Sequence, residues 1–332
     1  MKRLIGGILT LLLLSGCGGS GTDWSGYAPP EAARLTVYTT HEETVYAPVV
    51  KEFEERTGLW VQVETGSGVA LLEKIAGEAE QPVCDLLLSG SVDSLQANSG
   101  LFEPYISPEA ANLDEGCQCA DGTWTAFSLL PAVMIYNPIL VRNNPPEDWE
   151  SLLDPAWRGR IAFPEPEASS SGYTVLAALL QVLPGEPLET LTAFYENLEG
   201  HVPADPGDAV AEVAEGSCMI GVAPEDAALQ AVDSRSDVAL LYPDEGVVCL
   251  PDGMAVVKGA PHRDNARLFI DFCLSKDVQN YLTGISRRPV RRDIPGTLAD
   301  TEEFRRLDYD LDCAIREREA VLSLWRQLEE EP

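Results

Sequence analysis

The chain has 332 residues and a formal net charge of -31 at pH 7. So negative a chain repels nucleic acid and anionic membranes, which excludes a nucleic-acid-binding protein and a polybasic membrane-binding protein. Apolar residues make up 45% of the sequence, which is typical of a folded body rather than a disordered one. A chain of this length favours two lobes, because single cores stop growing at about 250–300 residues.

The first sixteen residues have the form of a secretory signal peptide. Lys2 and Arg3 give a positive start, and an apolar run over residues 4–14 follows. That run is shorter than the ~20 apolar residues that a transmembrane helix needs. We therefore expect residues 1–16 to be a targeting segment that is removed from the mature protein.

Cys17 follows small residues at the end of that run, a pattern that resembles a bacterial lipobox. We expect lipid on Cys17 and a flexible tether over residues 17–33, which are rich in Gly, Ser, Pro and Ala. The protein is then extracytoplasmic, in the periplasmic space or on the outer face of the cytoplasmic membrane, and contacts the membrane only through its lipid. The alternative is an ordinary signal peptide with a chance cysteine.

Strands and helices alternate after the tether. The first predicted helix has apolar residues at i, i+3, i+4 and i+7 from Tyr46 to Phe53, and Gly58 stands at its C-cap. Alternating strands and helices indicate a parallel sheet with right-handed crossovers. The predicted strands cover residues 34–38, 60–64 and 84–88, and the predicted helices cover residues 43–57, 69–79 and 92–98.

An extended apolar stretch over residues 125–137 is expected to cross into a second lobe. Further strands are expected at residues 160–163, 219–222, 239–242 and 254–257, the last two returning the chain to the first lobe. Further helices are expected at residues 171–183, 187–199, 206–215, 224–232 and 262–274, with a helical tail from residue 301. The predicted class is therefore two-lobed α/β, with residues 34–130 and 251–332 in lobe 1 and residues 131–250 in lobe 2.

Loops rich in hydroxyl side chains and glycine lie at several predicted helix starts. Ligands of parallel sheets bind beyond the carboxyl ends of the strands, where these loops stand. Helix N-termini offer free N–H groups and a partial positive charge, so the loops can bind an anion without lysine or arginine. The alternative for each loop is ordinary helix capping. The candidate anion contacts are Thr39, Thr40, Ser67, Ser89, Ser91, Ser170, Ser171 and Thr174.

His41 stands at a predicted strand end and is a candidate ligand contact. The zinc-protease pattern needs a second histidine at position 45, where Val45 stands. The chain also has no Gly-x-Ser-x-Gly elbow and no phosphate-loop Gly-Lys-Ser/Thr. We therefore predict a binding protein rather than an enzyme, with no catalytic residue, no metal and no cofactor. The seven cysteines after Cys17 are expected to be mostly small buried side chains rather than a disulfide framework.

Several stretches together carry a family likeness. Residues 53–58 read Phe-Glu-Glu-Arg-Thr-Gly, and residues 84–91 read Cys-Asp-Leu-Leu-Leu-Ser-Gly-Ser. Further matching stretches are residues 36–38, 149–161, 169–174, 242–246, 251–253 and 265–272. Over residues 34 to about 294 the chain resembles bacterial ABC-importer solute-binding lipoproteins, in the branch that includes ferric-ion, phosphonate and sugar-phosphate binders.

This resemblance implies a type II periplasmic-binding-protein-like fold with two crossover strands and a ligand cleft between the lobes. It also implies hinge closure on the ligand, docking on permease subunits in the membrane, and a monomer. The ferric branch holds its metal with an adjacent tyrosine pair after a second-lobe strand. The matching residues 220–226 contain no tyrosine, and no Tyr-Tyr pair occurs in the chain.

The serine-rich loop at residues 169–174 matches the segment that holds an anion in the ferric branch, so the anion is expected to be part of the ligand itself. Glu225 and Glu245 are candidates to meet a cationic or hydroxylated part of the solute. Arg288 and Arg291 are candidates for a charge clamp, or alternatively for salt bridges on an acidic surface.

The sequence thus predicts the solute-binding component of an ABC importer that captures a small phosphate- or phosphonate-bearing solute and delivers it to the permease. One alternative is a ferric-ion binding protein that uses a synergistic anion. A second alternative is a secreted enzyme or a sensor scaffold on the same fold.

Overall fold

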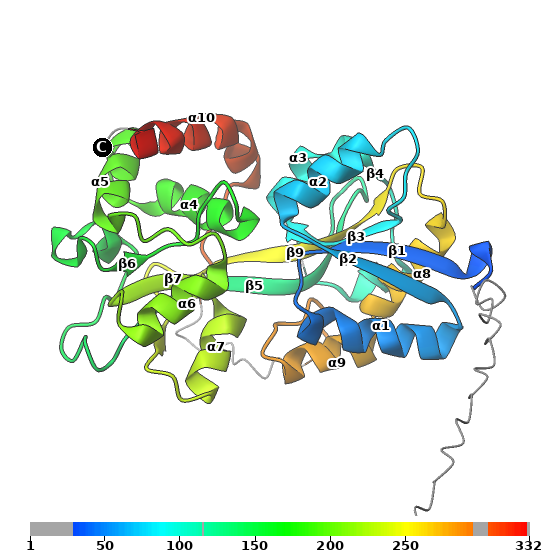
Figure 1. The fold of residues 1–332 in the computed structure, drawn as a ribbon, viewed down its shortest axis with the longest axis horizontal. Helices are drawn as coiled ribbons and strands as arrows, with labels where there is room; N and C mark the ends of the chain where they lie inside the picture. The colour runs from blue at the N-terminus through cyan, green and yellow to red at the C-terminus, as the bar shows by residue number, and fades with distance from the viewer. Residues whose placement is uncertain (1–28, 115, 295–304, 331–332) are drawn as a thin grey trace, which may run out of the picture.

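The structure is a computed structural model that describes residues 29–114, 116–294 and 305–330. Two lobes lie side by side and share one sheet (Figure 1). In the described residues this sheet has nine strands in the order β2-β1-β3-β9-β5-β7-β6, with β4 paired to β9 and β8 paired to β5. The two-lobed α/β class is confirmed.

Two long antiparallel strands, β5 (Thr125–Tyr136) and β9 (Val248–Val257), run through both lobes. In the first lobe β9 pairs with β3 and β4, and in the second lobe β5 pairs with β7 and β8. The predicted pair of crossover strands is therefore confirmed. The prediction of β9 was too short, because Pro251-Asp252-Gly253 reads as a turn in the sequence but lies inside the strand.

Helices cover both faces of the sheet in the first lobe. Leu35 and Val37 point to the face covered by α1, α8 and α9, whereas Tyr38 points to the face covered by α2 and α3, as the two-residue period of a strand requires (Figure 1). The elements are β1 (Arg34–Thr39), α1 (Glu43–Thr57), β2 (Trp60–Thr65), α2 (Gly68–Gly77), β3 (Leu86–Ser91), α3 (Val92–Ala97), β4 (Phe102–Glu103), α8 (Arg263–Cys273) and α9 (Lys276–Gly284).

The second lobe repeats this arrangement. Met134 packs with α4, α5 and α10, and the next residue, Ile135, packs with α6 and α7 on the opposite face. The elements are β6 (Ile161–Ala162), α4 (Ser170–Val182), α5 (Pro187–Leu198), α6 (Pro206–Glu215), β7 (Ile220–Pro224), α7 (Glu225–Asp233), β8 (Ala239–Leu241) and α10 (Leu311–Glu330). Short 3-10 helices cover Glu31–Ala33, Ser99–Leu101, Pro108–Asn112, Glu150–Leu153 and Pro155–Trp157.

The C-terminal helix α10 packs into the core of the second lobe, whereas the sequence interpretation placed it in the first (Figure 1). It also touches the first lobe, because Arg318 Nη1 lies 3.3 Å from Asp93 Oδ2 of α3. Its Trp325 is fully buried, with its ring 5.0 Å from that of Tyr195 and 6.4 Å from that of Phe163. Burial of one indole ring removes a large apolar area from water, which explains why this otherwise charged helix packs there. Helix α9 was also missed, because residues 276–284 mix polar and apolar side chains without a long apolar stripe.

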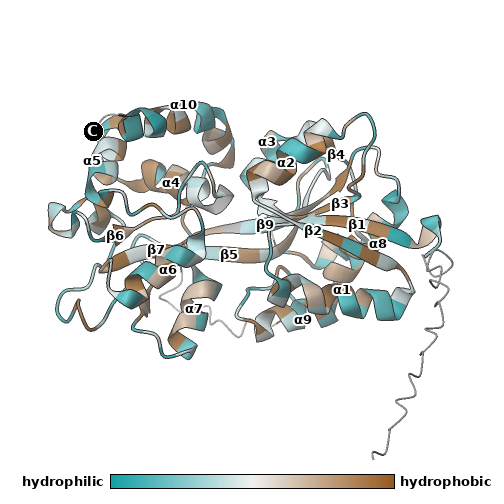
Figure 2. Ribbon diagram, in the orientation of Figure 1, coloured by the Kyte–Doolittle hydropathy of each residue, from teal (hydrophilic) through white to brown (hydrophobic). Residues whose placement is uncertain are grey.

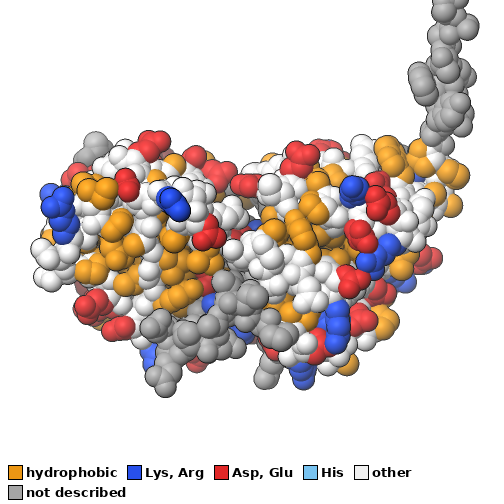
Figure 3. All heavy atoms as spheres, turned by 90° about the horizontal axis from the view of Figure 1, so that it is seen from below, with side chains coloured by type: hydrophobic (Ala, Val, Ile, Leu, Met, Phe, Trp, Pro, Cys, Tyr) orange, Lys and Arg blue, Asp and Glu red, His pale blue; other side chains and the backbone are white. Residues whose placement is uncertain are grey.

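Hydrophobic residues concentrate in the central strands and on the inward faces of the helices, while hydrophilic residues face outward (Figure 2). Acidic side chains lie over both lobes on the face seen in Figure 3, as the net charge of -31 leads one to expect. No helix among the described residues has the length and apolar character needed to cross a membrane.

Candidate functional site

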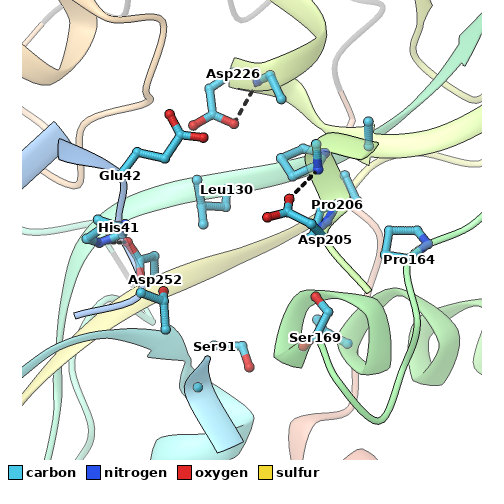
Figure 4. A pocket seen from close by; sticks show the side chains of 18 of the residues that line it. His41, Glu42, Ser91, Leu130, Pro164, Ser169, Asp205, Pro206, Asp226 and Asp252 are labelled. Atoms are coloured by element: carbon cyan, nitrogen blue, oxygen red, sulfur yellow. Dashed lines mark hydrogen bonds and ion pairs between the residues drawn. The ribbon is translucent and has the colours of Figure 1, made fainter. Parts of the chain in front are cut away.

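A cavity of about 470 Å³ lies between the two lobes (Figure 4). The first lobe contributes the loops after β1, β2 and β3, and the second lobe contributes the starts of α4, α6 and α7. Residues 130–132 of β5 and Pro251 and Asp252 of β9 connect the two walls. A concave site of this size between two lobes is typical of small-molecule binding.

Six helices in the described part of the chain begin at this cavity: α1, α2, α3, α4, α6 and α7. The first turn of a helix leaves backbone N–H groups without intrahelical partners and carries a partial positive charge. These helix starts reach the cavity from both faces of the shared sheet (Figure 1). The residues that cap them differ between the two faces.

Helices α2, α3 and α4 lie on one face of the sheet and begin with serines (Figure 1). Ser67 accepts a hydrogen bond from Ala70 N at 3.3 Å, Ser91 is the N-cap residue of α3, and Ser169 accepts from Gly172 N at 3.1 Å. We call the five hydroxyl side chains that line this part of the cavity the hydroxyl end. They are Thr40, Ser67, Ser91, Ser169 and Thr174.

Helices α1, α6 and α7 lie on the other face and carry acids at their starts. Asp205 Oδ1 accepts from Gly207 N at 2.7 Å, and Asp226 Oδ1 accepts from Ala227 N at 2.9 Å. We call Glu42, Asp205 and Asp226 the carboxylate end. In Figure 4, Glu42 and Asp226 lie on one side of the cavity, Ser91 and Ser169 lie on the other, and Asp205 lies between them.

A buried ionic network forms the wall beside these two ends. Arg287 Nε lies 2.9 Å from Asp226 Oδ2, and Arg287 Nη1 lies 3.4 Å from Asp252 Oδ2. His41 Nε2 lies 2.9 Å from the same Asp252 oxygen. The β5–β9 register shifts between Ala126 and Ser128, a bulge next to Asp252 of the kind that redirects side chains. Arg287 is thus held by carboxylates from both lobes.

At the hydroxyl end, the buried Asp93 connects the two lobes. Asp93 Oδ1 accepts from Thr174 Oγ1 at 3.0 Å, and Asp93 Oδ2 lies 3.3 Å from Arg318 Nη1 of α10. Burial raises the pKa of the Asp93 carboxyl, while Ser91, Arg318 and Thr174 oppose this shift. The partners of this acid thus offset only part of the effect of burial on its pKa.

Of the thirteen predicted ligand contacts, Thr40, His41, Ser67, Ser91 and Thr174 line the cavity. Thr39 does not: it is buried and donates to Leu88 O at 2.6 Å, which ties β1 to β3. Ser89, Ser170 and Ser171 have their backbone at the end of β3 and in the first turn of α4, but their side chains lie outside the described set, as does all of Cys17.

Glu225 and Arg288 do not line the cavity, because they pair with each other. Arg288 Nε lies 2.8 Å from Glu225 Oε2, Arg288 Nη2 donates to Glu225 Oε1 at 3.0 Å, and both side chains are buried. Tyr242 Oη donates to the same carboxylate at 2.6 Å. Burial, together with this bond to Glu225, raises the pKa of Tyr242. The pair joins the first lobe to α7.

Glu245 and Arg291 also lie outside the cavity lining. The Glu245 carboxylate accepts from Trp149 N at 3.0 Å through either oxygen. Arg291 Nη1 donates to Leu274 O at 2.7 Å, and Arg291 Nε lies 2.8 Å from Asp293 Oδ1, a bond that raises the arginine pKa. The structure thus assigns both residues to internal contacts and does not bring them to the predicted cleft.

The sequence interpretation missed eight polar residues that line the cavity: Glu42, Thr44, Ser169, Asp205, Asp226, Gln230, Asp252 and Arg287. A local signal existed for two of them. Ser169 directly precedes a predicted helix, and Asp205 precedes Pro206, which is the N-cap-and-proline pattern of a helix start. No such signal was recognised for the others, and Asp226, Asp252 and Arg287 among them depend on how the lobes pack.

Residues 81–311 match the model of a family of bacterial extracellular solute-binding proteins. The chain belongs to this family. The predicted membership is confirmed, and the protein is an extracytoplasmic solute-binding protein of the ABC-importer type.

Three related proteins illustrate the range of the family. Iron uptake protein A1 of Synechocystis is 27% identical over 90% of this chain and 88% of its own. A putative 2-aminoethylphosphonate-binding periplasmic protein of Salmonella typhi is 23% identical over 73% of each chain. The fold is similar to that of the periplasmic binding protein AfuA of Actinobacillus pleuropneumoniae with fructose-6-phosphate bound, with a TM-score of 0.80 and 21% identity over 90% of this chain and 99% of that one.

Proposed function

We propose that the cavity captures a small solute that has a phosphate or phosphonate group at one end and an ammonium or hydroxyl group at the other. The protein then delivers this solute to permease subunits in the membrane. The observation that carries the proposal is the division of the six helix starts into a hydroxyl end and a carboxylate end.

The hydroxyl end suits the anionic group. Helices α2 and α4 begin with serine caps and have no acid in the first turn, so no carboxylate of their own cancels their partial positive charges. Helix α3 also begins with a serine, and the acid in its first turn, Asp93, is buried and bonded to Thr174 and Arg318. Gly172 in the first turn of α4 lets the backbone of residues 164–165 pack against this helix start, since a Cβ there would stand 2.7 Å from Pro164 O. Hydroxyl and N–H donors around a phosphate form a site that needs no lysine.

The carboxylate end suits the cationic or hydroxylated group. Glu42, Asp205 and Asp226 place negative charge at helix starts, where it already compensates the helix dipoles. A second anionic group there would be repelled, whereas an ammonium group would gain charge-assisted hydrogen bonds. This division supports anion capture by a protein of charge -31, because the local field at each end differs from the field of the whole molecule.

The relatives support a two-ended solute. One is named for 2-aminoethylphosphonate, which has an amine and a phosphonate, and the structural neighbour holds fructose 6-phosphate, which has hydroxyls and a phosphate. Both solutes have the pairing of groups that the two ends of the cavity favour.

A thermal-shift panel tests the proposal. At a hundredfold excess of ligand over Kd, binding stabilises the native state by about 2.7 kcal/mol. Aminoalkylphosphonates and sugar phosphates should raise the melting temperature, and Ser169→Ala should weaken that response. The matched control is Ser275→Ala, which removes an N-cap serine of α9 outside the cavity. No stabilisation by any phosphorylated or phosphonate compound would refute the proposal, and turnover of a compound would instead favour an enzyme.

A ferric-ion binding protein is the second candidate. Glu42, Asp205 and Asp226 offer hard oxygen donors of the kind that ferric iron prefers, and one relative is an iron uptake protein. No tyrosine stands among the described lining residues. Iron content measured after incubation with ferric citrate and gel filtration separates the two candidates. Stoichiometric iron that is lost in Asp205→Asn favours iron, and no retained iron favours the phosphorylated solute.

Lipid anchoring through Cys17 belongs to the same proposal. The sequence pattern before Cys17 supports it, and an anchor would hold the protein near its permease. Expression of the full chain in a bacterial host, followed by detergent phase partition, tests this step. The wild-type chain should enter the detergent phase and Cys17→Ser should stay in the aqueous phase. Equal partition of the two would refute the anchor.

A further inference from the structure

Three potential metal ligands of different chemistry lie together in the second lobe, outside the cavity lining. They are His201, Glu212 and Cys218. One nitrogen, one carboxylate oxygen and one sulfur from these side chains all lie within 4.8 Å of one another. Nothing in the solute-capture mechanism uses them.

The fold fixes each of the three residues by backbone hydrogen bonds. His201 follows α5, and its carbonyl accepts from Phe163 N at 3.1 Å beside β6. Glu212 stands in the last turns of α6, and Gly216 ends that helix with a φ of 81°. This left-handed turn brings Cys218 back, so that Cys218 N donates to Glu212 O at 3.1 Å.

Two of the distances between the three ligand atoms are close to the edges of a metal coordination tetrahedron. His201 Nδ1 lies 3.1 Å from Glu212 Oε2, and Cys218 Sγ lies 3.4 Å from the same oxygen. Tetrahedral zinc with bonds of ~2.0–2.3 Å separates neighbouring ligand atoms by roughly 3.3–3.6 Å. His201 and Cys218 both contact the same carboxylate oxygen of Glu212. A single cation between the three ligand atoms would replace both hydrogen bonds.

We propose that His201, Glu212 and Cys218 form a second binding site, for Zn²⁺ or a chemically similar divalent transition metal. A thiolate and a carboxylate neutralise the two charges of the ion, so the loaded site has no net charge to desolvate. On binding, the Sγ–metal bond forms as the thiol proton leaves to solvent, with no change of oxidation state. A thiolate and an imidazole disfavour Ca²⁺ and Mg²⁺, which take oxygen ligands.

The burial of the three residues fits this coordination. Cys218 is fully buried, while the side chains of His201 and Glu212 are about one-third exposed, at 34% and 29%. The ion therefore has an entry path from solvent and room for water in the fourth position. The site is independent of the solute cavity and of the function proposed for it.

Cobalt substitution tests the site directly. Purified mature protein titrated with Co²⁺ should show a near-ultraviolet thiolate-to-cobalt charge-transfer band that reaches its limit at one ion per chain, and Zn²⁺ should abolish it. Cys218→Ser should lose the band. The matched control is Cys84→Ser, which removes another buried cysteine of the described chain and should keep it.

Cys218 is a core residue, so Cys218→Ser could lose the band through misfolding, and a second variant separates these two causes. Glu212→Gln leaves the core intact and should lower the Co²⁺ affinity at least ~10-fold, with an unchanged unfolding curve in chelator. Asp205→Asn, in the solute cavity, should leave Co²⁺ binding unchanged. Absence of the band in wild-type protein, or its persistence in Cys218→Ser, would overturn the proposal.

Discussion

Both ends of the cleft are formed by helix N-termini, but the side chains at these N-termini differ between the two ends. At the hydroxyl end, α2, α3 and α4 begin with serines, whereas at the carboxylate end α1, α6 and α7 begin with acids. Each helix start has a partial positive charge, which a carboxylate at the cap or in the first turn compensates and a hydroxyl cap leaves to the ligand. The side chains at the helix starts, and not the helices themselves, thus set which charge each end favours.

Neighbouring acids at the carboxylate end also differ in role. Glu225 and Asp226 are consecutive at the start of α7, yet Glu225 is held by Arg288 outside the cavity and Asp226 faces the cavity beside Arg287. Glu225 therefore contributes to the stability of the fold, whereas Asp226 is placed to contribute to the affinity for the solute. The two can be separated by substitution.

The largest effect is expected for Glu225→Gln. This change removes the Glu225 carboxylate charge from beside the buried Arg288, which should lower the free energy of unfolding by about 3–5 kcal/mol. Urea denaturation measures it, with Glu52→Gln at the exposed Glu52–Arg56 pair as the control that should change by less than about 1 kcal/mol. Equal effects of the two variants would show that the buried pair has no special role.

The next effect is expected for Asp205→Asn. Asparagine caps helices as well as aspartate does, so α6 should keep its start. Loss of the charge should weaken binding of an amine-bearing phosphonate by about 10- to 150-fold, the equivalent of about 1.5–3 kcal/mol. Calorimetry measures it against Asp154→Asn, an N-cap change outside the cavity. An unchanged Kd would remove Asp205 from the solute site.

A smaller effect is expected for Ser169→Ala at the hydroxyl end. The loss of one neutral hydrogen bond should weaken binding of phosphonate and aminophosphonate alike, by about 2- to 13-fold. Equal losses for the two compounds would place Ser169 at the anionic group. A loss confined to the amine-bearing compound would reverse the assignment of the two ends.

The smallest effect concerns pH and Asp93, the buried acid at the hydroxyl end. Burial raises its pKa in the folded state, so the folded state binds its proton more tightly than the unfolded state does. The free energy of unfolding should therefore fall as the pH rises from about 4 through the raised pKa. Asp93→Asn should remove this slope in urea denaturation at several pH values, and identical slopes in both proteins would contradict the argument.

Much of the fold follows from local sequence patterns. The first helix ends at Gly58 as expected, and the helix start at Pro206 agrees with the structure, because capping and proline preferences act within one turn. The placement of α10 could not be predicted in this way. It depends on Trp325 reaching the core of a lobe far away in the sequence.

The candidate site could be predicted only in part. Ser67 and Ser91 line the cavity because they follow strands of a parallel sheet, which is a rule of topology. The choice of Arg287 over Arg288 and Arg291 has no local signal, since all three belong to one basic run. Each arginine side chain points toward a carboxylate partner that comes from another element of the fold.

The most direct test of the two-ended cleft is calorimetry on the wild-type protein with two compounds of equal length, an aminoalkylphosphonate and the same alkylphosphonate without its amine. The account predicts that both bind, and that the amine-bearing compound binds at least ~10-fold more tightly. Equal affinities, or tighter binding of the compound without the amine, would contradict it.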